Sequence, residues 1–369
     1  ALDGTLRAVP GLLPSVIKAR KAGRQVIVPR DNAAEAMLAR ATVFAATDLR
    51  EVADHLAGRA PLQPGEAAPL TARSRRYAEL LDVRGQQSAK RALEIAAAGF
   101  HNLLLIGPPG TGKSMLARRL PGILPPMSEQ EALDTASVCS IAGAPVAPGD
   151  WLGRPFRSPH HTASAAALVG GGRTLSPGEI SRAHNGVLFM DELPEFNRTV
   201  LEALREPLET GSVRIARAGA HADFPARFQL VAAMNPCPCG YLGDEKSDCR
   251  CSRDRVVAYR NKVSGPLLDR IDLHVEVLRP STAVLRDGEP GAECTAAVAR
   301  RVAQARQIGA ERSGIPNALL EGDALAETCP LDDKCWALLE TAADRFNLSA
   351  RAHQRVLRVA RTIADLAAR

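Results

Sequence analysis

Residues 107–114 read GPPGTGKS and lie between an apolar segment, NLLLIG (102–107), and a helical segment, KSMLARRL (113–120). This is the G-x-x-x-x-G-K-[ST] loop in the strand–loop–helix context that the motif requires. Its glycines let backbone N–H groups turn toward phosphate oxygens, and the following helix adds a partial positive charge. We expect Lys113 to reach the β and γ phosphates of a nucleotide and Ser114 to ligate Mg²⁺. The predicted phosphate-binding residues are Gly107, Pro108, Pro109, Gly110, Thr111, Gly112, Lys113 and Ser114.

A second motif, VLFMDE (187–192), follows the loop by about eighty residues and consists of four apolar residues and two carboxylates. A buried strand with this ending delivers both acids to the carboxyl edge of a parallel sheet, where the phosphates bind. We expect Asp191 to hold Mg²⁺ and Glu192 to act as general base on the attacking water. An apolar strand with a solvated acidic end is common by itself, but the preceding phosphate loop favours the functional interpretation.

Length and composition narrow the class of protein. At about 150 residues per domain, 369 residues predict two or three domains. With 46% hydrophobic and 24% charged residues, ordinary soluble folding is expected, and no apolar run is long enough for a membrane span. We therefore expect a cytoplasmic protein without a membrane partner. The chain starts with Ala1 instead of Met, so we also expect a preceding segment.

Charge and aromatic content bear on nucleic-acid binding. The net charge of +6 is too small to identify a partner, but residues 345–369 hold six arginines and one acid, Asp365. Aromatic residues make up only 4% of the chain, which argues against a protein that binds single strands by base stacking.

Hydrophobic periodicity divides the chain into four parts. Residues 1–58 alternate short strands and helices, including a Thr47-capped helix, and residues 59–70 form a Pro- and Ala-rich linker. Residues 71–285 alternate helices with apolar strands, which predicts an α/β core with a parallel sheet covered on both faces. Within it, residues 197–210 are expected to form one helix. Residues 286–369 are helical throughout.

The segments between the two nucleotide motifs and after them are more specific. They include RPFRSPHHTAS (154–164), SPGEISRAHNGVLFMDELPEF (176–196) and LVAAMNPCPCG (230–240). On these residues the chain resembles the ComM (YifB-type) magnesium-chelatase-like AAA+ ATPases over its whole length. The resemblance implies an AAA+ core with a C-terminal helical lid, ATP and Mg²⁺ as substrate and cofactor, a hexameric ring, and DNA branch migration during natural transformation.

The resemblance also assigns roles to single residues. Asn235 matches the polar sensor residue that reads the γ-phosphate, although an Asn capping a strand end would look the same. Arg270 matches the arginine finger that a neighbouring subunit supplies, which implies a ring. Arg351 matches the lid arginine that contacts phosphate, with a solvated basic helix face as the alternative. The segment DVRGQ (82–86) matches the part that touches adenine and ribose.

Two insertions in the core are candidates for DNA contact. The first, 154–172, contains His160 and His161 and is expected to be a mobile pore loop. The second, 212–228, reads as a hairpin that carries Arg214, Arg217 and His221. In a ring such hairpins would line a channel and contact phosphates without reading sequence. An exposed surface hairpin is the alternative.

Four of the eight cysteines form the pattern C-x-C-x9-C-x-C, namely Cys237, Cys239, Cys249 and Cys251. Four thiolates suit tetrahedral Zn²⁺, so a structural zinc site is predicted, with four reduced thiols as the alternative.

Residues 1–58 resemble the carboxyl-terminal half of the Lon-type, S5-like domain. The position that matches the catalytic lysine of Lon proteases holds Leu13. A serine nucleophile would lack its general base there, so peptidase activity is not expected. A half-domain also predicts apolar surface that is either exposed or paired elsewhere. The main alternative to a DNA motor is a magnesium-chelatase motor subunit that drives metal insertion with partner proteins.

Overall fold

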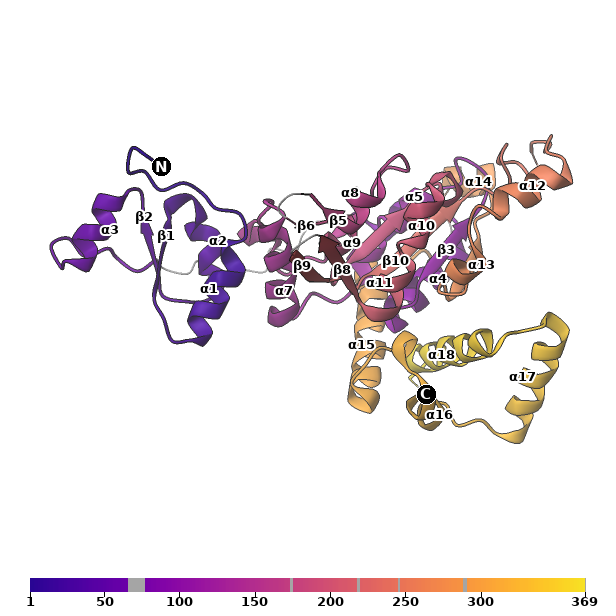
Figure 1. The fold of residues 1–369 in the computed structure, drawn as a ribbon. Helices are drawn as coiled ribbons and strands as arrows, with labels where there is room; N and C mark the ends of the chain where they lie inside the picture. Colours follow the sequence, from indigo (N-terminus) through magenta and orange to yellow (C-terminus); the bar gives the residue numbers. More distant parts are fainter. Residues whose placement is uncertain (66–76, 173–174, 218–219, 245, 288–290, 369) are drawn as a thin grey trace.

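A computed structural model describes the chain except for residues 66–76, 173–174, 218–219, 245, 288–290 and 369 (Figure 1). The N-terminal unit contains two parallel strands, β1 and β2, which pair from Val26↔Val43 to Pro29↔Ala46. Its elements are α1 (Leu12–Lys21), β1 (Val26–Pro29), α2 (Ala33–Met37), β2 (Val43–Ala46) and α3 (Leu49–Leu56). The predicted cap of α3 was wrong by one residue, because the side chain of Asp48 accepts the bonds from the first-turn N–H groups.

The N-terminal unit shares its hydrophobic core with the ATPase core. Leu13 and Val16 of α1 lie in one buried cluster with Ala132 and Ala136 of α7 (Glu129–Ile141) and with Trp151. Leu13 is therefore a core residue with no exposed surface. The apolar surface predicted for this unit is paired with α7.

The central sheet has five parallel strands in the order β11-β3-β10-β7-β4. These are β3 (Leu103–Ile106), β4 (Phe156–Arg157), β7 (Val187–Met190), β10 (Gln229–Met234) and β11 (Leu273–Glu276). The predicted α/β class is confirmed. Since the strands are parallel, all their carboxyl ends lie at one edge of the sheet, where polar residues of different strands meet.

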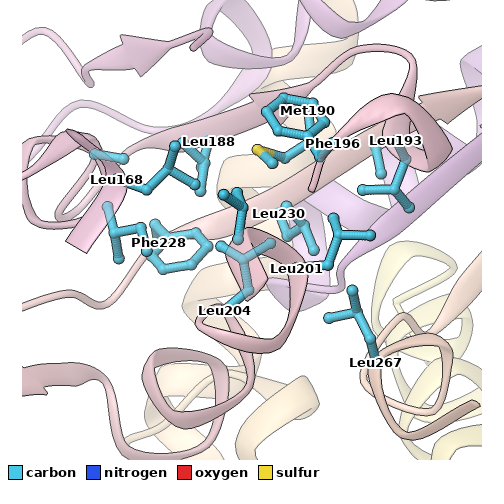
Figure 2. Close-up of a cluster of buried hydrophobic side chains, with 14 of the residues drawn as sticks. Leu168, Leu188, Met190, Leu193, Phe196, Leu201, Leu204, Phe228, Leu230 and Leu267 are labelled. Carbon is cyan, nitrogen blue, oxygen red and sulfur yellow. The ribbon is translucent and has the colours of Figure 1, made fainter. Parts of the chain in front are cut away.

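Side chains alternate between two cores, one on each face of the sheet. Leu188, Met190 and Leu230 lie in the cluster shown in Figure 2, whereas Val187 and Phe189 lie in the cluster on the other face. Helices cover both faces, among them α4 (Gln87–Gly99), α5 (Lys113–Ala117), α6 (Leu120–Ile123), α10 (Arg198–Glu202), α11 (Arg205–Thr210), α12 (Arg253–Arg260) and α13 (Gly265–Leu268).

The predicted single helix over 197–210 is divided. Helix α10 ends at Glu202 and α11 begins at Arg205, and both Leu201 and Leu204 lie in the core. Pro207 has no N–H to bond to the carbonyl of Ala203, which accounts for the interruption at this point.

The two insertions are ordered where they are described. The first contains α8 (Ala165–Val169), the strand pair β5 (Gly170–Gly171) and β6 (Ser176–Pro177), and then α9 (Glu179–Arg182). The second is the predicted hairpin, in which β8 (Ser212–Arg217) pairs antiparallel with β9 (Ala220–Pro225). Two residues of its predicted turn, 218 and 219, lie outside the described residues.

The lid consists of α15 (Thr295–Ser313), α16 (Gly322–Thr328), α17 (Asp333–Phe346) and α18 (Ala350–Leu366), and α14 (Thr282–Asp287) precedes it. Helices α15 and α18 pack against α4 (Figure 1). Two arginines of α18 bond to other segments: Arg355 donates to Ile271 O at 3.0 Å and Arg358 to Leu320 O at 2.7 Å. These two residues are therefore not part of the solvated basic face that was the alternative for Arg351. Among the described residues, no helix is both long and apolar enough to cross a lipid bilayer.

Candidate nucleotide site

The phosphate loop connects β3 to α5, as the motif predicts. Gly110 and Gly112 have φ angles of 76° and 92°, and a Cβ atom at either position would point into open space. Such conformations suit glycine and let successive N–H groups face one concavity. The same turn also contains the rest of the loop, namely Gly107, Pro108, Pro109 and Thr111. Within it the Thr111 hydroxyl donates to Pro108 O at 2.9 Å.

Lys113 lies under this loop and is buried. Its Nζ donates to Gly107 O at 2.6 Å, to Pro108 O at 2.8 Å and to Asn235 Oδ1 at 3.1 Å. Burial lowers the pKa of Lys113, and the two carboxylates at the end of β7 oppose this shift. Because its bonds are to neutral oxygens, the ammonium group can exchange them for phosphate oxygens.

The end of β7 faces the start of α5. Ser114 Oγ donates to Asp191 Oδ2 at 2.6 Å, so a hydroxyl and a carboxylate meet beside the phosphate loop. Oxygen donors of these types are the ligands that Mg²⁺ takes in nucleotide sites, and the two residues therefore fit the predicted ion. When bound, the ion offsets negative charge on the phosphate oxygens.

Glu192 follows Asp191 with a φ of 55°, a left-handed conformation that is uncommon outside glycine. Its Oε2 lies 3.0 Å from Nδ1 of His161, which belongs to the segment after β4. The His161 ring also lies edge-on against Phe196 and 4.2 Å from the ring of His160. His161 was predicted as a pore-loop residue, and its position also connects that loop to the predicted general base. The HH doublet did not predict this contact, because His161 and Glu192 are 31 positions apart in the sequence.

Asn235 comes directly after β10, the neighbour of β3. The register Met234↔Ile106 puts Asn235 level with Gly107, and the bond to Lys113 completes the contact. The segment 82–86 also reaches the loop, since Gln86 Nε2 donates to Thr111 O at 3.1 Å. Residues predicted from four separate segments therefore meet at one edge of the sheet.

Arg270 and Arg351 lie elsewhere. Arg270 lies three residues before the start of β11, and its backbone carbonyl accepts a bond from the side chain of Asn102, which precedes β3, at 2.8 Å. The side chains of Arg270 and Arg351 converge on Glu209 of α11, the latter at 3.7 Å. They line a cleft of about 450 Å³ between core and lid. Sequence reasoning missed Glu209, because nothing in the local sequence of α11 marks it as their partner.

The hairpin residues have mixed surroundings. Arg214 is exposed and forms an ion pair with Asp223 across the strands at 2.8 Å, while His221 is exposed on β9. The side chain of Arg217 lies outside the described part of the structure. His160 is exposed, with Nδ1 2.9 Å from Thr162 Oγ1.

The four clustered cysteines meet beside Asn235, with their sulfurs within 4.8 Å of one another. This geometry is compatible with the predicted metal site.

With this geometry established, comparison with known proteins identifies the family. The model of magnesium chelatase subunit ChlI matches residues 79–285, and the model of its C-terminal region matches residues 292–369. The chain belongs to the magnesium-chelatase-like AAA+ family. It is 49% identical to the competence protein ComM of Haemophilus influenzae and 48% identical to the uncharacterized protein YifB of Salmonella typhimurium. Both alignments cover 99% of this chain and 72% of the relative.

A magnesium-chelatase 38 kDa subunit of Rhodobacter capsulatus is more distant, with 29% identity over 60% of this chain and 61% of that subunit. The resemblance to ComM and YifB is thus confirmed over nearly the full chain, and the family indicates ATPase activity with ATP and Mg²⁺.

Proposed function

We propose that this chain is an ATP-hydrolysing motor that assembles as a ring, a hexamer by family resemblance, and moves branched or single-stranded DNA. The process it would serve is branch migration in natural transformation and recombination. One observation supports the ring. The candidate catalytic residues lie at opposite ends of the strands of one sheet, with the phosphate loop at the carboxyl ends and Arg270 at the amino ends.

The separation follows from the topology. The phosphate loop begins where β3 ends, whereas Arg270 is bonded to Asn102, just before β3 begins. A four-residue strand spans about 13 Å, at roughly 3.3 Å per residue. The Arg270 side chain therefore does not complete its own subunit's site. A head-to-tail neighbour would bring it to the next phosphate loop, as closed rings do.

Arg351 belongs with Arg270 in this proposal. Both guanidinium groups share Glu209, so both would face the neighbouring nucleotide when that carboxylate releases them. An arginine supplied in this way is worth about 10³ to 10⁵ in rate, because it offsets charge on the transferring phosphoryl group.

The residues at the carboxyl edge would divide the remaining work. Lys113 would exchange its carbonyl partners for phosphate oxygens, and Ser114 and Asp191 would hold Mg²⁺. Glu192 would accept a proton from the attacking water, which Asn235 orients. His161 would restrain Glu192 through the contact described above until the segment that carries His161 moves.

A subunit-mixing experiment tests the ring. Arg270→Ala removes the arginine finger but keeps an intact phosphate loop and Glu192. Glu192→Gln removes the general base but keeps an intact finger. Each variant alone should therefore be nearly inactive. In a one-to-one mixture of exchanging subunits, about a quarter of the interfaces combine the intact Glu192 of an Arg270→Ala subunit with the intact Arg270 of a Glu192→Gln subunit. These interfaces should recover activity. Absence of recovery in subunits shown to exchange would contradict a finger that acts across subunits.

The DNA part is supported by the hairpin and by the name of the Haemophilus relative. Hydrolysis and DNA binding should respond to forked or single-stranded DNA at low salt and weaken as salt rises. Arg217→Ala should reduce this response and leave the DNA-free rate unchanged. If no DNA has any effect, the alternative of a metal-chelatase motor driven by partner proteins would be favoured, as the match to the ChlI model allows.

A further inference from the structure

The loop between β10 and α12 gathers four thiols that no catalytic step uses. The sulfur–sulfur distances are 3.3 Å for Cys237–Cys239, 3.6 Å for Cys237–Cys249 and 3.6 Å for Cys239–Cys249. Cys251 completes the group, with all four sulfurs within 4.8 Å of one another. All eight cysteines of the chain are free thiols, so these distances do not reflect disulfides.

These distances match one metal ion held by four thiolates. A tetrahedral site with Zn–S bonds of about 2.3 Å has sulfur–sulfur edges of about 3.8 Å. Among the described residues, the group that could hold an ion consists of these four sulfurs alone. Four thiolates are the composition of closed structural sites and leave no open position for catalysis. Packing of apolar side chains does not account for the cluster, since three of the four thiols are only half-buried.

The cluster lies directly against the nucleotide site. Gly240, next to Cys239, has a φ of 87°, and a Cβ atom there would lie 2.7 Å from Pro109 Cδ in the phosphate loop. The same Cβ would lie 3.8 Å from Asn235 Cγ. The turn at 237–240 therefore packs on the phosphate loop and on the predicted sensor residue.

Two contacts hold the cysteine loop at its start and near its middle. Arg260 of α12 donates to Pro236 O at 3.3 Å, and Asp244, whose side chain is buried, pairs with Arg279 at 3.1 Å. The stretch 240–248 is mostly polar, and none of its described residues belongs to the two cores of the sheet. A bound ion would cross-link the two cysteine pairs at the ends of this loop and so stabilise a segment that has little hydrophobic core of its own.

We propose that Cys237, Cys239, Cys249 and Cys251 bind one structural Zn²⁺ as thiolates, releasing the thiol protons to solvent, and that the ion holds the 236–251 loop against the phosphate loop. Metal binding itself does not depend on the proposed motor function.

The first test measures metal in the protein as isolated. Elemental analysis of the full chain should find about one zinc per chain, and titration with an organomercurial should release that zinc as thiols are modified. The variant Cys249→Ser/Cys251→Ser should lose at least nine-tenths of it. Cys335→Ser, which removes an exposed thiol of α17, is the matched control and should keep the full amount.

A second measurement keeps the proposal testable if the double variant does not fold. Wild-type protein from which zinc has been released and the thiols re-reduced should bind Co²⁺ with the intense visible bands of tetrahedral thiolate coordination. Trypsin should cut after Lys246 or Arg250 much faster in the metal-free chain than in the zinc-loaded chain. Absence of zinc together with absence of Co²⁺ binding would overturn the site, and equal trypsin sensitivity would overturn its role in holding the loop. Neither outcome depends on ATP hydrolysis or DNA binding.

Discussion

Removing the imidazole of His161 should raise the DNA-free rate of ATP hydrolysis and weaken the response to DNA. In the structure the Glu192 carboxylate is 3.0 Å from His161 Nδ1. His161 lies on the segment that joins β4 to α8, in the insertion proposed to contact DNA. A general base held by that segment is restrained until the segment moves. Without the imidazole, Glu192 is free to face the attacking water.

The exposure of the pair limits the size of the effect. The His161 side chain is 33% exposed and that of Glu192 is 53% exposed, so solvent screens the contact. Exposed pairs of this kind are worth about 0.2 to 1 kcal/mol. Since 1.36 kcal/mol is a factor of ten in rate, His161→Ala should raise the DNA-free kcat by no more than about fivefold. The ratio of DNA-stimulated to DNA-free rate should fall by the same factor.

The assay is steady-state ATP hydrolysis at saturating ATP, with and without forked DNA. His160→Ala is the matched control, because it removes a neighbouring imidazole whose Nδ1 is bonded to Thr162 instead of Glu192. His161→Asn, which keeps an N–H donor, should stay closer to wild type than His161→Ala. An unchanged DNA-free rate in folded His161→Ala would refute the restraint. A tenfold fall would show that His161 holds Glu192 in its productive position.

Three further predictions concern separate parts of the chain. Glu192→Gln should lower kcat about 10² to 10⁴-fold while nucleotide binding, measured by equilibrium fluorescence, is retained, since general-base catalysis supplies that range. Asp365→Ala should lower the free energy of unfolding by about 3 kcal/mol in urea titrations, because it leaves the partly buried Arg312 without its partner. Burial alone would raise the pKa of Asp365, but hydrogen bonds, led by the one from Arg312, hold this pKa below its ordinary value of 3.8. The contribution of Asp365 to stability is therefore complete above about pH 4 and should decline in urea titrations at more acidic pH. Gly240→Ala should cost about 1 to 3 kcal/mol of stability and raise KM for ATP, because its methyl group would displace Pro109; an unchanged KM would contradict the packing of this turn on the phosphate loop.

Much of the carboxyl edge could be predicted from sequence because each part is a local pattern. The loop at 107–114 must turn around phosphates within eight residues, and a strand that ends in Asp191 and Glu192 exposes them at its end. The hairpin at 212–228 is also local. The division of the 197–210 helix is local too, because Pro207 has no N–H to bond to the carbonyl of Ala203. Local patterns do not supply the partner of a side chain when that partner comes from a distant segment, as Glu209 does for Arg270 and Arg351.

The terminal arginines show the same limit. By sequence, residues 345–369 are a basic helix in which any arginine could be solvated. In the structure Arg355 and Arg358 donate to backbone carbonyls of other segments, whereas Arg351 is 64% exposed at the side chain. Charge counts along a helix do not distinguish these environments, because the partners come from distant parts of the chain.

Local sequence patterns predicted the phosphate loop, the acidic strand end, the α/β class and the cysteine cluster, because backbone conformation and alternating burial depend on neighbouring residues. Three relations come from the three-dimensional fold alone: Arg270 and Arg351 lie at the edge opposite Lys113, Glu209 contacts both arginines, and His161 contacts Glu192. Those relations follow from the strand order and from where each strand begins and ends. They are distances through the fold, and residue spacing along the chain does not encode them.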